Sequence, residues 1–294
     1  MQMRVSIIGS GVVGGIIGEG LKQLENEVLF YDIEPKTIEK IKNKGHNATT
    51  DITYAMANSD ISFVCVPTPN QEGKIDFSYV KSAAENIGRA LKQKNGYHLV
   101  VVKSTVTPTT TQNVIIPILE EFSGKKAGID FGVCMNPEFL TESANTWTDD
   151  NNFARGFFDE ERIVIGEFDK KSGDLLQNLY EKLDKPIFRT DLKTAEFIKY
   201  AANCALASRI SYWNEIFLIS QRLGIDSNLV ANVVSLDKRI GQYGTVHGKS
   251  YGGKCLNKDT KAFISWAKEY HDPIMLKAVD DINEKMRKEF GVRE

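Results

Sequence analysis

Short apolar runs alternate with longer amphipathic segments over the first two-thirds of the chain. Each run is about four to six residues long, rich in β-branched side chains and almost continuously apolar, as strands covered by helices on both faces are. The runs are Arg4–Ile8, Val28–Tyr31, Ile61–Val66, Leu99–Val102, Phe131–Met135 and Arg162–Ile165. The segments with helical spacing between them are Val12–Leu24, Pro35–Lys44, Tyr79–Gln93 and Pro108–Phe122. This alternation predicts an α/β fold built on a doubly wound parallel sheet.

The pattern changes after Asp191, where the strand signals end. Ala195–Leu223 is predicted to form one long helix, which Gly224 terminates. Further helices are predicted at Ser227–Ser235, Asp259–Glu269 and Pro273–Phe290. We therefore expect an α/β domain over residues 1–190 and an all-helical domain over residues 191–294. The long helix is apolar around much of its circumference, which is typical of a domain core or a subunit contact and favours a homodimer through the helical domain.

Composition and charge narrow the possible classes of protein. The 41% hydrophobic and 26% charged content is that of an ordinary soluble protein. A net charge of -2 without a basic run argues against a nucleic-acid partner, and no apolar stretch is long enough to cross a membrane. The N-terminus enters the first strand without a secretory signal, so we expect a cytoplasmic protein. The four cysteines show neither C-x-x-C nor zinc spacing, so we expect no disulfide and no metal.

A glycine-rich loop, Gly9-Ser10-Gly11-Val12-Val13-Gly14, directly follows the first strand and opens the first helix. In this context the first glycine makes a tight turn, the second lets a pyrophosphate approach the backbone, and the third lets helix and strand pack closely. Asp32 ends the second strand, where a carboxylate binds ribose hydroxyls and repels the 2′-phosphate of NADP. The sequence therefore predicts a Rossmann-type site for NAD. Its binding residues are Gly9, Gly11, Val12, Val13, Gly14 and Asp32.

Three further clusters follow predicted strands, at the edge where an open α/β sheet binds its ligands. Val64–Pro69 holds two prolines that we expect beside the nicotinamide ribose, although an ordinary strand-ending turn is the alternative. Lys103–Val106 places two hydroxyls on the same edge, and each could equally be a helix cap. Asn136–Glu142 carries two carboxylates four residues apart, suited to a base and an orienting group, or else a solvated acidic turn.

The segment Gly248–Asp259 is the most informative in the chain. Cys255 follows a glycine pair and enters a helix near Asp259, where backbone N–H groups and Lys258 could stabilise a thiolate. A cysteine has an ordinary pKa of about 8.5, so such stabilisation would make Cys255 a nucleophile at neutral pH. Cys65 and Cys134, by contrast, lie within strand-like runs and are expected to be buried apolar residues.

With these residues, the chain resembles the UDP-glucose/GDP-mannose dehydrogenase family from the glycine loop to about Phe263. The most specific segments are the Gly-Gly-Lys-Cys run ending at Cys255, with its Lys258 and Asp259, and the Glu-Phe-Leu-Thr-Glu run at Glu138–Glu142. The helical segment Glu196–Asn203 carries the lysine and asparagine of the family. Further matching segments are Arg162–Gly166, Asn214-Glu215 and Asp237–Gly241.

The resemblance implies NAD-dependent oxidation of a nucleotide-sugar C6 alcohol to the carboxylate, as from UDP-glucose to UDP-glucuronate, and a role in polysaccharide biosynthesis. Cys255 would attack the aldehyde formed by the first hydride transfer, and a second transfer would leave a thioester that water hydrolyses. Lys199 and Asn203, one helical turn apart, would both reach the substrate oxygen. There Lys199 would stabilise developing negative charge and Asn203 would donate a hydrogen bond.

The resemblance also implies roles at the strand ends. Asp259 and Thr105 would position a water, and Glu138 would act as the base in thioester hydrolysis with Glu142 in support. The implied cofactor contacts beyond the glycine loop and Asp32 are Pro67, Thr68, Thr105 and Glu142. The implied substrate contacts are Glu138, Phe139, Leu140, Lys199, Asn203, Tyr251, Gly252 and Lys258.

The family normally continues with a second α/β domain that binds the nucleotide of the sugar donor, and we expect this chain to lack that domain. One alternative is a two-domain β-hydroxyacid dehydrogenase, which also uses a lysine and an asparagine but needs no cysteine and makes a single oxidation. Another is a non-catalytic remnant that binds NAD and serves as a subunit. The number of NADH formed per product would separate the three. Two NADH would favour the double oxidation, one would favour the β-hydroxyacid dehydrogenase, and none would favour the non-catalytic subunit.

Overall fold

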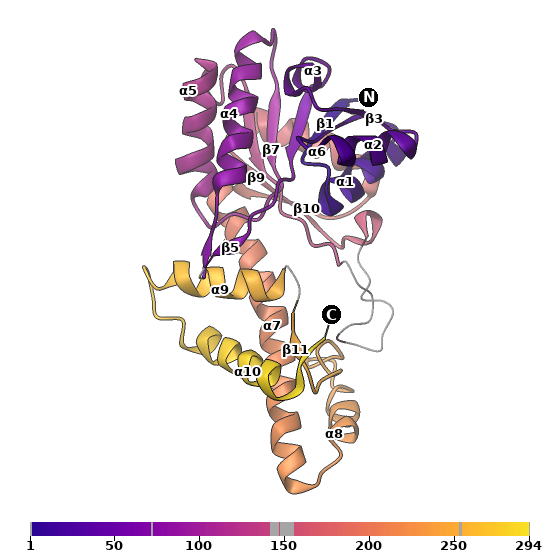
Figure 1. Cartoon of the computed structure of the whole chain (residues 1–294), viewed down its shortest axis with the longest axis vertical. Coiled ribbons are helices and arrows are strands. Elements are labelled where there is room, and N and C mark those ends of the chain that lie inside the picture. The colour runs from indigo at the N-terminus through magenta and orange to yellow at the C-terminus, as the bar shows by residue number, and fades with distance from the viewer. Residues whose placement is uncertain (1, 72, 142–146, 148–155, 253–254, 294) are drawn as a thin grey trace. The chain divides into compact units, whose positions relative to one another are not determined.

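The computed structural model describes residues 2–71, 73–141, 147, 156–252 and 255–293 (Figure 1). The chain divides into two compact units. The N-terminal unit comprises Met1–Pro69, Asp76–Leu140 and Gly156–Lys199, and the C-terminal unit comprises Asn70–Ile75, Thr141–Arg155 and Tyr200–Glu294. The division falls inside the long helix α7 (Leu192–Leu223). The domain boundary expected near residue 190 stays a prediction.

Among the described residues of the N-terminal unit, eight strands form one sheet in the order β10-β9-β8-β7-β4-β1-β2-β3. Their bounds are β1 (Arg4–Ile8), β2 (Glu27–Tyr31), β3 (Asn47–Thr49), β4 (Ile61–Val64), β7 (Leu99–Val102), β8 (Gly132–Met135), β9 (Ile163–Glu167) and β10 (Ile187–Asp191). The six strands from β3 to β8 in this order run parallel, which confirms the Rossmann-type fold class. Their carboxyl ends therefore meet at one edge of the sheet.

The last two strands of the sheet, β9 and β10, run antiparallel to the other six, which the sequence pattern did not predict. β9 pairs with β8 in antiparallel register, with Cys134 opposite Glu167, and β10 pairs with β9 in parallel register. A parallel neighbour needs a crossover helix. Between β8 and β9 the described residues hold only the short 3₁₀ turn Phe157–Asp159, whereas α6 (Lys170–Tyr180) joins β9 to β10.

Helices cover both faces of the sheet in two separate apolar cores. One core packs α3 (Ile52–Ala57), α4 (Ser78–Gln93), α5 (Ile116–Ser123) and the start of α7 on one face. A π-helical turn, Thr111–Ile115, leads into α5. The other core packs α1 (Val12–Gln23), α2 (Pro35–Asn43) and α6 on the opposite face. Figure 1 shows α4 and α5 together on one side of the sheet and α1 on the other. Because both faces are covered, the strands are almost wholly apolar.

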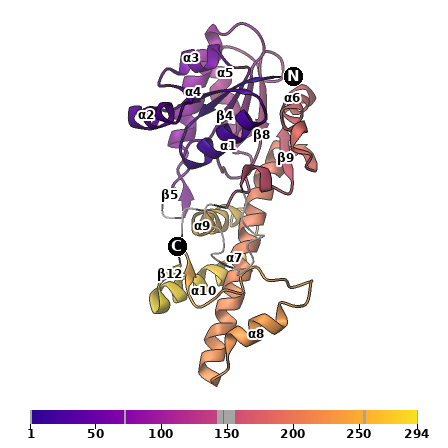
Figure 2. The same cartoon turned by 90° about the vertical axis from the view of Figure 1, so that its right-hand side faces the viewer.

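The C-terminal unit is mainly helical. It contains the rest of α7, α8 (Ser227–Val234), α9 (Leu256–Ala267) and α10 (Ile274–Phe290). Two short pairs of strands, β5 (Asn70–Gln71) with β6 (Lys74–Ile75) and β11 (Ser250–Tyr251) with β12 (Val292–Arg293), complete it. Residues of α7 and α10 share one buried cluster with Tyr251, and α10 lies beside α7 (Figure 2). None of the helices in the described part of the chain is long and apolar enough to cross a membrane.

Candidate active site

The glycine loop lies where β1 passes into α1. Gly9 adopts φ +93°, a conformation that favours glycine. A Cβ on Gly14 would lie 2.1 Å from the carbonyl oxygen of Gly9, so α1 packs this closely on the loop only with glycine there. A Cβ on Gly11 would meet no atom within 4 Å. Because α1 has no side-chain cap and no acidic residue in its first turn, its N-terminal N–H groups can receive an anion, and the loop fits the pyrophosphate of a dinucleotide.

Asp32 ends β2 next to this loop. Its Oδ2 accepts a hydrogen bond from the Ser10 N–H at 2.8 Å, and its Oδ1 accepts one from the Glu34 N–H at 3.0 Å. Each carboxylate oxygen keeps a further lone pair, so the partly exposed carboxylate can still accept the two hydroxyls of a ribose. The glycine loop and Asp32 together therefore fit the adenosine half of NAD, with Val12 and Val13 opening the helix.

The loops after β4 and β7 complete this edge of the N-terminal unit. Pro67 is exposed and Thr68 is buried. The Ser104 hydroxyl donates to the carbonyl oxygen of Val66 at 2.7 Å, so it holds the loop after β4 in place. Thr105 is partly exposed next to it. Of these two hydroxyl residues, Ser104 therefore stabilises the loop, whereas Thr105 is partly exposed to solvent.

Glu138 follows β8 and pairs with Lys199 of α7, within the N-terminal unit. The ammonium of Lys199 donates to Oε1 of Glu138 at 2.9 Å and to the carbonyl oxygen of Glu138 at 2.6 Å. The Leu140 N–H donates to Oε2 at 2.6 Å. Burial raises the pKa of Glu138, but four opposing effects together hold that pKa below its ordinary value: the charge and the hydrogen bond of Lys199, the hydrogen bond from the Leu140 N–H, and the charge of Lys103. Phe139 is partly buried, with its ring 5.6 Å from Nζ of Lys199.

Cys255 lies in the C-terminal unit, where it is exposed at the N-terminus of α9. Asp259 is buried in the first turn of α9, and its N–H donates to the carbonyl oxygen of Cys255 at 2.8 Å. Its Oδ2 accepts from the amide of Asn203 at 2.6 Å, and its Oδ1 accepts from the ammonium of Lys258 at 2.5 Å. The structure thus brings Asn203, Lys258 and Asp259 together in one cluster at the helix end that begins with Cys255.

The loop before Cys255 is held by buried asparagine side chains. The amide of Asn283 in α10 accepts from the N–H of Tyr251 at 2.9 Å and donates to its carbonyl oxygen at 3.1 Å. Asn214 of α7 accepts from the N–H of Gly248 at 2.9 Å. The side chain of Tyr251 is only 1% exposed, so a substrate contact at this residue would have to involve its backbone. A Cβ on Gly252 would lie 2.3 Å from a methyl group of Val292, so that side chain would have to move to admit any other residue.

The other three cysteines have a different environment. Burial raises the pKa of the Cys65 thiol and of the Cys204 thiol to about 12. It raises the pKa of Cys134 further still. None of the four cysteines, all of them described, is in a disulfide. Cys255 is therefore the exposed thiol of the chain, as the sequence predicts.

Some predicted site residues lie outside the described part of the chain. Glu142 is one of them, and so are two residues of the glycine-rich segment before Cys255. Within the described residues, no group of histidine, cysteine, aspartate or glutamate side chains could hold a metal ion. Sequence reasoning assigned no role to Lys103, Glu160 or Asn283. In the segment Lys103–Val106 the sequence drew attention to the hydroxyls of Ser104 and Thr105 rather than to the lysine. No local pattern distinguishes a buried Glu160 or Asn283 from a surface residue.

Comparisons with known proteins agree with this geometry. Residues 43–184 match the sequence model of the UDP-glucose/GDP-mannose dehydrogenase family, NAD binding domain, and residues 193–285 match the central domain of the same family. The chain is 42% identical to a GDP-mannose 6-dehydrogenase of Pseudomonas syringae pv. tomato over 88% of this chain and 63% of that protein. It is 36% identical to a UDP-glucose 6-dehydrogenase of Haloferax volcanii over 96% of this chain and 70% of that protein.

Comparison with a solved structure supports the same family. A UDP-glucose dehydrogenase from Pyrobaculum islandicum matches with a TM-score of 0.87 and 32% identity, covering 98% of this chain and 69% of that one. The chain thus spans about two-thirds of the length of its relatives, 63% in the case of the Pseudomonas protein. NAD is the cofactor of the matched N-terminal domain, in agreement with the fit of the glycine loop and Asp32. The chain belongs to the UDP-glucose/GDP-mannose dehydrogenase family.

Proposed function

We propose that this protein oxidises the C6 alcohol of a nucleotide sugar to the carboxylate in two NAD-dependent steps that pass through a thioester on Cys255. The observation that carries the proposal is the exposed Cys255 at the N-terminus of α9, one helical turn before an Asp259 carboxylate that Asn203 and Lys258 hold in place. The names of the relatives, which act on GDP-mannose and UDP-glucose, support the substrate class. NAD, when bound, supplies the hydride acceptor in each oxidation.

Cys255 performs the covalent chemistry in this proposal. Loss of a hydride and a proton from the C6 alcohol gives an aldehyde, and the sulfur of Cys255 adds to its carbon to form a thiohemiacetal. Loss of a second hydride and the hydroxyl proton leaves a thioester. Water then adds to the carbonyl carbon, the carbon–sulfur bond breaks, and the carboxylate leaves. The start of α9 favours the thiolate, because helix N-terminal N–H groups stabilise negative charge.

Glu138 and Lys199 are proposed to handle protons and charge. A carboxylate whose pKa lies below its ordinary value is ionised at neutral pH, so Glu138 can accept a proton from the attacking water. Lys199 stabilises negative charge that develops on the substrate oxygen. Its ammonium binds both the backbone carbonyl oxygen and the carboxylate of Glu138, so the proposed base and the proposed cation lie together. We propose that Thr105 and Asp259 position the water and that Asn203 donates to the substrate oxygen.

A substrate screen tests this function. The full chain would be given NAD with UDP-glucose, GDP-mannose or related sugar donors, and NADH would be followed by absorbance. We expect turnover with at least one donor and a loss of more than about 100-fold in Cys255→Ser, because the nucleophile is weakened. Cys134→Ala, which alters a buried thiol in the sheet, is the matched control and should keep its activity. Equal activity in Cys255→Ser and the wild type would contradict the thioester route.

We further propose that the protein is a cytoplasmic homodimer joined through its helical part. Six exposed apolar side chains lie within a short stretch of the chain, from the end of α7 through α8 to the residues just after it, which supports a covered surface there. They are Ile219, Leu223, Ile225, Leu229, Val233 and Leu236. Sedimentation at micromolar concentration tests the dimer, and a monomer would contradict it.

A further inference from the structure

The turn from Asn136 to Leu140 carries the buried Glu138, and three further buried charged side chains of the N-terminal unit, Lys103, Lys199 and Glu160, lie around it. Lys103 is 3% exposed, Lys199 4%, and Glu138 and Glu160 each 8%. Two are cations and two are anions at neutral pH in water. Burying a charge without a partner is costly, so the balanced set indicates that these four side chains stabilise one another's charges.

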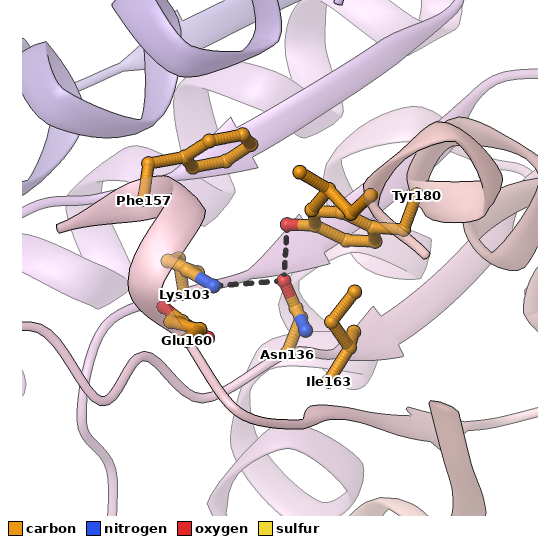
Figure 3. A pocket seen from close by; sticks show the side chains of 7 residues that line it. Lys103, Asn136, Phe157, Glu160, Ile163 and Tyr180 are labelled. Carbon is orange, nitrogen blue, oxygen red and sulfur yellow. Dashed lines mark hydrogen bonds between the residues drawn. The ribbon is translucent and has the colours of Figure 1, made fainter. Parts of the chain in front are cut away.

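Lys103 holds the beginning of the turn. Its ammonium donates to Oδ1 of Asn136 at 2.9 Å and to the carbonyl oxygen of Pro137 at 3.3 Å. The Tyr180 hydroxyl donates to the same Oδ1 at 2.7 Å, and the Asn136 amide donates to the carbonyl oxygen of Val164 at 2.7 Å. Figure 3 shows Lys103 and Tyr180 converging on Asn136. The side chain of Asn136, two residues before Glu138, is thus held by three hydrogen bonds.

Glu160 holds the other end of the turn. It lies beside Lys103 on the wall of a small cavity that Asn136 and Tyr180 also line (Figure 3). Burial raises the pKa of Glu160, and the negative charge of Glu138 raises it further, so the two carboxylates oppose each other's ionisation. Lys103 and a hydrogen bond from the Phe139 backbone partly offset that rise. Burial likewise lowers the pKa of Lys103, and Glu160 and Glu138 partly offset that fall. The charged form of each group is therefore favoured by the opposite charge beside it.

We propose that Lys103 and Glu160 are positioning residues, which hold the turn that presents Glu138 and set its charge, Lys103 favouring the ionised carboxylate and Glu160 opposing it. This inference rests on the proposed role of Glu138 as the base. Lys103 and Glu160 act through Glu138 and the backbone on either side of it, while Lys199 binds Glu138 directly.

The remaining groups around the turn do not change this balance. Burial raises the pKa of Cys65 to about 12 and raises that of Tyr180 well above its ordinary value, so both are neutral at neutral pH. Arg162 places its guanidinium 4.2 Å from the centre of the Phe139 ring. It adds a fixed positive charge that no substitution below alters.

The test measures the titration of Glu138 without any turnover. The full chain would be labelled with ¹³C at the side-chain carboxyl of glutamate, and the signal of Glu138 would be identified by its loss in Glu138→Gln. The pKa would then be followed in the wild type, in Lys103→Met and in Glu160→Gln. Lys94→Met is the matched control, because Lys94 also donates to two carbonyl oxygens, those of Met56 and Ser59, in the same unit.

We expect an upward shift of the Glu138 pKa in Lys103→Met, a downward shift in Glu160→Gln and none in Lys94→Met. Opposite signs are the essential result, because a general loosening of the fold would move both variants alike. If Lys103→Met does not fold, the downward shift in Glu160→Gln still decides the question. A Glu138 pKa that is unchanged or raised in Glu160→Gln would overturn the inference. Since no substrate is present, absence of turnover would reject the proposed function without affecting this result.

Discussion

Substitutions at three glycines, two in the glycine loop and one directly after it, separate packing from cofactor binding. Gly14→Ala places a Cβ 2.1 Å from the carbonyl oxygen of Gly9, whereas Cβ atoms essentially never come within 3.0 Å of a heavy atom that is not close to them in the chain. The N-terminus of α1 must therefore move away by nearly 1 Å. Overpacking of this kind costs about 1–3 kcal/mol of unfolding free energy. The same shift displaces the N–H groups that we expect to bind the pyrophosphate, so Gly14→Ala should lose both stability and NAD affinity.

The neighbouring glycines supply the controls. A Cβ on Gly15 or on Gly11 meets no atom within 4 Å. Gly15→Ala should stabilise the N-terminal unit by up to about 1 kcal/mol, because alanine is the better helix former. Gly11 has φ -70°, which alanine adopts without strain, so Gly11→Ala should leave stability unchanged. Its methyl group would nevertheless occupy the space where the pyrophosphate approaches, and NAD affinity should fall about tenfold or more, at least about 1.4 kcal/mol.

Urea unfolding followed by circular dichroism measures the stabilities, and isothermal titration with NAD measures the affinities. A Gly14→Ala variant as stable as Gly15→Ala would refute the packing argument. A Gly11→Ala variant that binds NAD as tightly as the wild type would refute the position assigned to the pyrophosphate. The two results are independent, since Gly11→Ala is expected to keep the fold intact.

Three further variants, two with single substitutions and one with a double substitution, address stability and assembly. Asn283→Leu removes the hydrogen-bond partners of both the N–H and the carbonyl oxygen of the buried Tyr251. The free energy of unfolding in urea should fall by about 2–5 kcal/mol, and a fall below about 0.5 kcal/mol would contradict that role. Burial lowers the pKa of His98 to about 3. The unfolded chain therefore takes up a proton near pH 6.5 that the folded chain does not, so stability should fall as the pH drops from 6.5 towards 3, by up to about 1.4 kcal/mol per unit. His98→Asn should have a shallower dependence on pH, and an unchanged slope would exclude His98 as its source. Leu229→Asp with Leu236→Asp should sediment as a monomer with unchanged circular dichroism, and a persistent dimer would place the interface elsewhere.

The α/β layout was predictable because its strands are buried on both faces. Leu99–Val102 and Gly132–Met135 are fully buried, and such runs are apolar throughout. β10 escaped prediction because Ile187–Asp191 lies at the edge of the sheet, is at most partly buried and has only two apolar residues, followed by three polar ones. α3 escaped because its six residues are too few to show a helical period.

The candidate site was predictable only where local chemistry shows in the sequence. Cys255 was identified because glycines precede it and Asp259 follows one helical turn later. Lys103 and Glu160 contact the same turn from segments 57 residues apart, and only the fold brings them together. The burial of Tyr251 depends in the same way on α7 and α10, which follow their own periodicity without reference to the loop.

The number of NADH molecules formed per molecule of sugar acid tests the double oxidation most directly. With a limiting amount of the accepted donor, NADH would be measured by absorbance and the acid by chromatography in the same sample. We predict two NADH per acid, together with a protein-bound acyl group on Cys255 that hydroxylamine releases. One NADH per product, with an aldehyde or ketone accumulating and no acyl group on Cys255, would contradict the account.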